Sequence, residues 1–211
     1  MKKIETKVFW KKITQLPRKQ NTLLVGIDGV GGSGKSTLAM VFAKLSPDVQ
    51  IVHIDDFYLP SNIQPEKQQI IGDLYDWRRL KTQVLKPLSE NRPAKYQIYN
   101  WSSDRLEDWV ECKPEGIILI EGVFTTSLEL RNYYDFLIWV DCPRGLRLER
   151  GLNRDGKDAR SQWENIWMPA EDRYIEQHNP KDNANVIVYG QGIPNVDPSD
   201  KLILQWNKFQ N

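Results

Sequence analysis

Short apolar segments alternate with longer amphipathic ones along the chain. The apolar segments 22–27, 50–54, 116–120, 136–140 and 185–188 are too short for helices and are predicted as buried strands. Segments with helical periodicity lie at 35–45, 76–88, 146–153 and 162–178. This rhythm of strand and helix predicts a three-layer α/β fold, in which a mostly parallel central sheet carries helices on both faces.

The other segments are predicted as a helix, a hairpin and irregular connections. Apolar residues at helical spacing predict a short helix that ends before Pro17, namely Phe9, Ile13 and Leu16. Weak alternation at 94–99 and 109–112 predicts a small β-hairpin, inserted at about 90–115 at one end of the sheet. The polar segment 59–73 is predicted as a loop, and the charged segment 154–160 as a flexible link that forms a lid at about 154–161. The pattern does not decide the structure of 202–206.

Composition limits the class of protein. A chain of 211 residues has room for one sizeable core, so 1–211 is predicted as a single domain. The net charge of +1 gives no global field that would favour nucleic acid or a membrane surface as a partner. Cys112 and Cys142 lack metal-ligand spacing and fit a reducing compartment. No signal peptide and no run of roughly 18 apolar residues is present, so we expect a cytoplasmic protein.

The segment between the first predicted strand and the following helix fits the phosphate-binding pattern G-x-x-x-x-G-K-[ST] at all four fixed positions. Its glycines would leave room for backbone N–H groups to approach phosphate oxygens and would permit positive φ, while the helix amino terminus favours anions. Lys35 would reach the β and γ phosphates of ATP, and the Ser36 hydroxyl would bind Mg²⁺. The predicted nucleotide-binding residues are Gly29, Gly31, Gly32, Ser33, Gly34, Lys35, Ser36 and Thr37.

Other interpretations of this segment stay open. The glycines also spell G-x-G-x-x-G, and Asp55 or Asp56 would suit a dinucleotide's ribose, but such a site has no need for Lys35 and Ser36. A glycine-rich turn without function is the plain alternative. A GTP-dependent switch would need Asn-Lys-x-Asp, whereas the one Asn-Lys pair continues as Phe209-Gln210.

Two carboxylates follow predicted strands, and ligands of open α/β sheets bind beyond these carboxyl ends. Asp55 is placed to accept a hydroxyl proton from a small acceptor, or else it caps a turn. Glu121 follows four aliphatic residues, the form of a Walker B acid that holds Mg²⁺, or else it is a solvated turn carboxylate.

Arginines recur every three or four residues after the fourth predicted strand, so a helix would place several on one face. They are Arg144, Arg147, Arg150 and Arg154. They would clamp the transferring phosphoryl group, with Arg154 and Arg160 in the link that closes over ATP. Exposed helical arginines are also common without such a role.

Further motifs follow the phosphate loop in a fixed order. They are Asp55-Asp56-Phe57-Tyr58, Tyr99-Asn100-Trp101, Ile120-Glu121-Gly122-Val123 and the arginine-rich stretch 147–155. Together with the phosphate loop they resemble the motifs of the uridine kinase family, within the wider group of phosphoribulokinase, pantothenate kinase and nicotinamide riboside kinase. The resemblance extends over about 22–190, most of the chain.

The resemblance implies a P-loop kinase fold, ATP as phosphoryl donor, Mg²⁺ as cofactor and a small-molecule acceptor. It implies that Asp55 is the base for the acceptor's 5′-hydroxyl. The residues that it implies around Mg²⁺ are Ser36, Asp55 and Glu121, and those around the acceptor are Tyr58, Asp76, Tyr99 and Trp101. It assigns the phosphates or the acceptor hydroxyls to Arg147, Arg150 and Arg154. An equally open interpretation is that Tyr99 and Trp101 belong to the core.

Two departures from the family pattern concern the acceptor. Asp104 stands where uridine kinases carry a histidine that reads the pyrimidine base, and the stretch before Asp76 lacks the usual His-Pro-Asp. With Ser102 and Ser103, Asp104 would suit another nucleoside or a different hydroxylated acceptor.

We therefore predict an ATP-dependent kinase that transfers the γ-phosphoryl group to a nucleoside 5′-hydroxyl, with Lys35, Asp55 and the arginines Arg147, Arg150 and Arg154 as catalytic residues. A kinase for pantothenate or a sugar phosphate is one alternative. A non-catalytic ATP-binding regulator is the other alternative. The presence of Asp55 argues against it, because a protein that only binds ATP requires no base. The sequence carries no signal for the oligomeric state.

Overall fold

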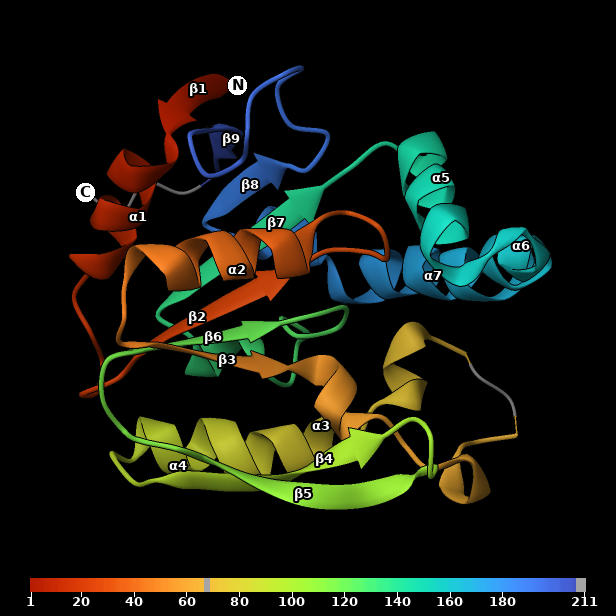
Figure 1. The fold of residues 1–211 in the computed structure, drawn as a ribbon. Coiled ribbons are helices and arrows are strands. Elements are labelled where there is room, and N and C mark those ends of the chain that lie inside the picture. Colours follow the sequence, from red (N-terminus) through yellow and green to blue (C-terminus); the bar gives the residue numbers. More distant parts are fainter. Residues whose placement is uncertain (67–68, 208–211) are drawn as a thin grey trace.

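A seven-stranded sheet forms the middle layer of the computed structural model, which describes residues 1–66 and 69–207 (Figure 1). The strands are β1 (Lys2–Glu5), β2 (Leu23–Asp28), β3 (Val49–His53), β4 (Ala94–Asn100), β5 (Arg105–Cys112), β6 (Ile117–Glu121), β7 (Phe136–Asp141), β8 (Val186–Tyr189) and β9 (Lys201–Trp206). The α-helices are α1 (Thr6–Thr14), α2 (Lys35–Leu45), α3 (Trp77–Leu80), α4 (Lys86–Ser89), α5 (Arg144–Asp155), α6 (Arg160–Gln162), α7 (Met168–His178) and α8 (Pro180–Asn183). Shorter turns are the 3₁₀ turns η1 (Ile54–Phe57), η2 (Ser61–Ile63), η3 (Ile71–Leu74), η5 (Arg131–Tyr133) and η6 (Lys157–Ala159), and the π-helical turns η4 (Lys81–Leu85) and η7 (Trp163–Trp167).

The strand order of the sheet is β1-β9-β8-β7-β2-β6-β3. The run from β8 to β3 is parallel, while β9 pairs antiparallel with both β8 and β1. The carboxyl ends of β2, β6 and β3 therefore meet at one edge, where Glu121 of β6 is in register with Ile27 of β2 and His53 of β3. Ligands of such sheets bind at this edge.

Helices cover both faces of the sheet because successive strand residues point to opposite sides. Leu23, Val25 and Ile27 of β2 pack beneath α1 and α2, whereas the intervening Leu24 packs on the other face. The helical run α3–η4–α4 and helix α7 cover that other face. The predicted three-layer α/β fold with a mostly parallel sheet is confirmed.

The hairpin β4–β5 forms a separate two-stranded sheet and does not extend the central one. Its inner face, including Ala94 and Tyr96, packs against the helical run through Leu80 and Val84. The hairpin thus stands beside the carboxyl end of β3, next to η1, as Figure 1 shows.

Two strands and one helical segment differ from the sequence prediction. The amino-terminal strand β1 was not predicted, because Lys-Lys-Ile-Glu is a polar edge strand with only Ile4 partly buried, and β9 fills the undecided segment 202–206. The segment 154–160, predicted as a flexible link, consists of the last turn of α5, the turn η6 and the start of α6. Trp163 Nε1 donates to Asp155 Oδ2 at 3.0 Å and ties this segment to η7.

No helix in the ranges 1–66 and 69–207 is long and apolar enough to cross a bilayer. Lys208 and Phe209-Gln210, which carry the argument against a GTP switch, lie outside the described residues.

Candidate active site

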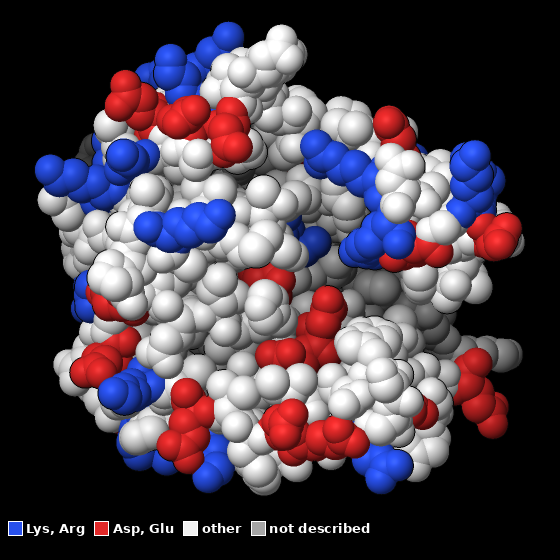
Figure 2. Space-filling model, viewed as in Figure 1, with Lys and Arg blue, Asp and Glu red and all other residues white. Residues whose placement is uncertain are grey.

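A cavity of about 880 Å³ opens at the carboxyl edge of the sheet. Its walls come from the phosphate loop, the turn η1 after β3, the end of β6, helices α5 and α7, and the segment after β8. Figure 2 shows the hollow, with basic side chains above it over α5 and acidic side chains below it. Charged groups of opposite sign therefore face each other across the cavity.

The phosphate loop needs its glycines for two different reasons. Gly29, Gly32 and Gly34 have φ values of 151°, 72° and 102°, a region that side chains other than glycine rarely adopt. Gly31 was expected to share this conformation but has no positive φ; its need is space, because a Cβ there would lie 2.9 Å from Glu171 Oε1. The loop is thus shaped both by its own backbone and by the helices packed behind it.

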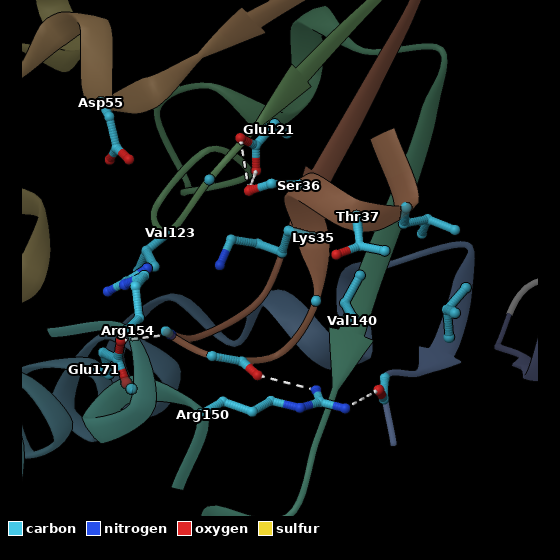
Figure 3. Close-up of a pocket in the computed structure, with 18 of the residues that line it drawn as sticks. Lys35, Ser36, Thr37, Asp55, Glu121, Val123, Val140, Arg150, Arg154 and Glu171 are labelled. Atoms are coloured by element: carbon cyan, nitrogen blue, oxygen red, sulfur yellow. Dashed lines mark hydrogen bonds between the residues drawn. The ribbon is translucent and has the colours of Figure 1, made fainter. Parts of the chain in front are cut away.

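Lys35 begins helix α2 and points into the cavity (Figure 3). Its Nζ donates to the carbonyl oxygen of Val30 at 3.1 Å, across the loop. Gly31, Gly32, Gly34, Ser36 and Thr37 also line the cavity, whereas Gly29 and Ser33 lie behind it. The loop therefore presents a cation and a helix amino terminus to the same space, an arrangement suited to phosphates.

Ser36 and Glu121 form the group best suited to a cation. Ser36 Oγ donates to Glu121 at 3.1 Å (Oε1) and 3.2 Å (Oε2), and His53 Nδ1 lies 2.6 Å from Oε1. Burial alone would raise the pKa of Glu121, but the hydrogen bond from His53 and the charge of Lys35 hold it below its ordinary value. The same hydrogen bond raises the pKa of His53. Glu121 is therefore ionised at neutral pH.

Ser36 and Glu121 suit Mg²⁺ better than a metal ion that is bound by protein side chains alone. Among residues 1–66 and 69–207, no cluster of three or more histidine, cysteine or acidic side chains could hold a metal ion. Mg²⁺ is usually bound through one or two carboxylates together with substrate phosphates and water. A hydroxyl and a carboxylate beside a phosphate loop meet that description.

Asp55 lies in η1, just beyond the end of β3, and its carboxylate projects into the cavity from the wall opposite the phosphate loop (Figure 3). The surrounding protein raises the pKa of Asp55 by desolvation, and the charge of Glu121 raises it further. Tyr75 Oη donates a long hydrogen bond of 3.4 Å to Oδ1. A carboxylate with a raised pKa in a cleft is suited to accept a proton.

Aromatic rings continue this wall away from Asp55. The rings of Tyr58 and Trp101 lie 4.5 Å apart, and Tyr75 meets Tyr58 edge-on at 5.7 Å. All three line the cavity, and the Trp101 side chain is 60% exposed. Tyr99 is buried behind them, 5.3 Å from Tyr58. We call Tyr58, Tyr75 and Trp101 the aromatic wall.

Two acidic residues predicted at the acceptor do not line the cavity. Asp76 caps helix α3, where its Oδ1 accepts the N–H of Arg79 at 3.0 Å. Asp104 accepts from Tyr99 Oη at 2.7 Å and from the N–H of Ser61 at 3.0 Å, and the Tyr99 hydrogen bond lowers the pKa of Asp104. Both carboxylates fix local structure, which the sequence motifs did not reveal.

The three arginines predicted at the phosphates differ in position. Arg150 donates to the carbonyl oxygens of Gly32 at 3.2 Å and Gly190 at 3.0 Å, so it braces the loop against the end of β8. Arg154 lines the cavity and pairs with Asp155 at 2.7 Å. Arg147 is buried and does not line the cavity. The three arginines of α5 therefore have different positions relative to the cavity.

Sequence reasoning missed the far end of the cavity, beyond the phosphate loop. The end of β8, the segment after it and the start of β9 line it with Tyr189, Gly190, Gly192, Val196, Pro198, Lys201 and Leu202. These residues belong to no motif; the only sequence signal is the cluster of glycine and proline after a predicted strand, which is typical of any turn.

It also missed Asp28, the fully buried last residue of β2. Its Oδ1 accepts the N–H of Gly29 at 2.6 Å, and its Oδ2 accepts from Tyr174 Oη at 2.6 Å and from the N–H and hydroxyl of Thr126 at 2.7 and 2.9 Å. Burial raises the pKa of Asp28, although these hydrogen bonds oppose the rise. Asp28 therefore anchors the start of the phosphate loop to helix α7.

Replacing Tyr174 with phenylalanine is expected to lower the free energy of unfolding by about 1.5–3 kcal/mol, because it removes a hydrogen bond to a buried carboxyl group. Tyr134→Phe is the matched control, since its buried hydroxyl donates to the neutral carbonyl of Thr125 at 3.0 Å. That change should cost only about 0.5–1.5 kcal/mol. If urea unfolding shows the same loss of free energy of unfolding in both variants, the Asp28 carboxyl group adds no strength to the hydrogen bond from Tyr174.

The phosphate loop facing Asp55 and Glu121 at the edge of a parallel sheet defines a P-loop phosphotransferase. The model of the phosphoribulokinase/uridine kinase family matches residues 24–196, and the chain belongs to this family. It is therefore a kinase that acts on a hydroxyl group of a small acceptor.

Named relatives are uridine kinases, and solved structures share the fold. A uridine kinase of Borrelia hermsii is 25% identical over 199 residues, covering 88% of this chain and 93% of the relative. A uridine kinase of Staphylococcus epidermidis is 27% identical over 182 residues, covering 79% and 87%. The structure of a possible uridine kinase from Bacillus stearothermophilus shares the fold, with a TM-score of 0.69 at 24% identity over 86% of this chain and 96% of that one. A D-glycerate 3-kinase from Cryptococcus neoformans shares it with a TM-score of 0.60 at 13% identity, covering 88% and 92%.

Proposed function

We propose that this protein transfers the γ-phosphoryl group of ATP to the 5′-hydroxyl of a nucleoside. The observation that carries the proposal is the position of Asp55 between the phosphate loop and the aromatic wall. A hydroxyl held there would lie beside a proton acceptor on one side and the phosphates on the other.

The residues of the cavity divide the chemistry of phosphoryl transfer among them. The loop N–H groups and Lys35 hold the phosphates and stabilise the charge on their oxygens. Ser36 and Glu121 would hold Mg²⁺, which supplies further charge neutralisation when bound. Arg154 stands at the cavity in the segment proposed as a lid. Asp55 orients the acceptor hydroxyl and takes its proton.

The acceptor side of the cavity favours a flat ring. Tyr58 and Trp101 offer ring faces for stacking, which tolerates any base. The basic residues on the cavity wall are Lys35, Arg150, Arg154 and Lys201. Lys35 follows the phosphate loop, Arg150 of α5 braces that loop, and Lys201 lies at the far end of the cavity. Arg154 of α5 interacts electrostatically with Asp55 and with Tyr75 of the aromatic wall. A sugar phosphate or pantothenate would bring a negative charge close to Asp55.

An acceptor screen tests the proposal. ATP consumption in the presence of Mg²⁺ is measured with nucleosides, nicotinamide riboside, pantothenate and sugar phosphates. We expect turnover with one or more nucleosides. Turnover confined to pantothenate or a sugar phosphate would contradict the nucleoside assignment, and ATP binding without turnover on any acceptor would favour a regulatory protein.

Replacing Trp101 with alanine is expected to raise the acceptor KM by roughly 10- to 100-fold and to leave the KM for ATP unchanged, because stacking contributes about 1–3 kcal/mol. Trp109→Ala is the matched control, since that exposed tryptophan of the same hairpin does not line the cavity. An unchanged acceptor KM in the Trp101 variant would remove the aromatic wall from acceptor binding.

A further inference from the structure

A buried ion pair lies directly behind the phosphate loop. Arg147 Nη1 of α5 is 3.1 Å from Glu171 Oε2 of α7, and the two residues are 5% and 3% exposed. The other oxygen, Glu171 Oε1, accepts the N–H of Gly31 at 2.7 Å. One carboxylate therefore joins two helices to the loop that is proposed to hold ATP.

The two members of the pair face different surroundings. Glu171 lines the cavity, and Figure 3 shows it beside the loop. Arg147 does not line the cavity, and its Nε is buried without a hydrogen-bond partner among the described residues. Its backbone packs so closely on the loop that a Cβ at Gly32 would lie 2.6 Å from the Arg147 carbonyl oxygen. The guanidinium is thus placed to meet Glu171 and is not placed to meet a ligand in the cavity.

The charge of Glu171 presents a problem for a nucleotide site. A carboxylate that holds a loop N–H stands near the negatively charged phosphates, and repulsion in a partly buried site is several times stronger than in water. A cation that pairs with the carboxylate removes this repulsion while leaving its hydrogen bond to the loop intact. Glu171 and Arg147 meet that requirement together.

We propose that Glu171 positions the Gly31 peptide of the phosphate loop and that Arg147 acts only through Glu171, by neutralising its charge. Arg147 is then a positioning residue and not one of the arginines that contact the phosphates. The inference rests on the proposed function in that ATP is the nucleotide bound.

The experiment compares the Kd for ATP, measured calorimetrically with Mg²⁺ and without acceptor, in wild type, Arg147→Met, Glu171→Gln and the double variant. Arg147→Met should weaken ATP binding by about tenfold or more, because it leaves an unpaired carboxylate beside the phosphates. Adding Glu171→Gln should restore the Kd to within about threefold of wild type, since the amide oxygen still accepts from Gly31 and no charge remains. In turnover assays the same pattern should appear in the KM for ATP and not in the acceptor KM.

A double variant that binds ATP as weakly as Arg147→Met would overturn the inference, because Arg147 would then serve the phosphates directly. Thermal unfolding shows whether each variant is folded. If Arg147→Met does not fold, Glu171→Gln alone decides: ATP binding within threefold of wild type, or tighter, supports the inference, and binding tenfold weaker overturns it. Wild-type protein that binds no ATP would overturn the proposed function and the inference together. Wild-type protein that binds ATP but phosphorylates no acceptor would overturn the proposed function alone, because the inference concerns ATP affinity and not phosphoryl transfer.

Discussion

Replacing Asp55 with asparagine is expected to lower kcat by about 10²-fold or more while ATP binding stays nearly normal. Asparagine keeps the size of the side chain but cannot take the proton of the acceptor hydroxyl. Asp55 faces the cavity from the wall opposite Lys35, so the change does not alter the phosphate loop. Steady-state kinetics with the best acceptor and a separate measurement of ATP affinity distinguish the two effects.

Asp56→Asn is the matched control for this prediction. The Asp56 carboxylate is one residue away but accepts from Tyr96 Oη at 3.2 Å, on the side of the hairpin, and does not line the cavity. Its replacement should leave kcat within a few fold of wild type. Undiminished activity of Asp55→Asn would mean that the base lies elsewhere.

Replacing Lys35 with alanine is expected to abolish measurable turnover, a loss of roughly 10³-fold or more, and to weaken ATP binding as well. The Lys35 ammonium reaches across the loop to the Val30 carbonyl oxygen and points into the cavity, where it would meet the phosphates in both ground and transition state. Calorimetry and steady-state kinetics measure the two losses.

Lys44→Ala, at the exposed far end of the same helix, controls for the loss of a positive charge from α2. That variant should keep wild-type kinetics. Wild-type kinetics in Lys35→Ala would remove the loop from the mechanism.

The central strands and helices were predictable because their apolar periodicity is strong. Buried parallel strands such as β2 and β6 read as continuous apolar runs, and α2 begins at Lys35, as the phosphate-loop pattern requires. Two strands at one end of the sheet, β1 and β9, were not predicted. The edge strand β1 exposes most of its side chains and lacks an apolar run, and β9 beside it is buried at only two of its six positions. A fully buried strand leaves a continuous apolar run in the sequence, and a strand with mostly exposed side chains does not.

The sequence could locate the part of the candidate site that lies at the carboxyl ends of the strands. Lys35, Asp55 and Glu121 come after different strands, and parallel pairing brings them to one cavity. A motif gives the order of residues but not the direction of each side chain. For that reason it could not show that Asp104 would be held by Tyr99 and Ser61, away from the cavity.

The groups that the sequence did not reveal reach the site from elements that are distant from it in the sequence, or have their partners there. Glu171 looks like an ordinary glutamate of a charged helix, and only the packing of α7 against the loop brings it to Gly31. Asp28 precedes the phosphate-loop pattern and gains its partners from Thr126 and Tyr174. Contacts over such separations depend on the finished fold.

The most direct test of the account follows the phosphoryl group itself. ATP labelled in its γ-phosphoryl group is incubated with Mg²⁺, the protein and a nucleoside, and the label is located by separating the products. The account predicts label in a nucleoside 5′-monophosphate, with transfer reduced about 10²-fold in Asp55→Asn. Label that stays in ATP or appears only as inorganic phosphate, with every nucleoside tried, would contradict the account.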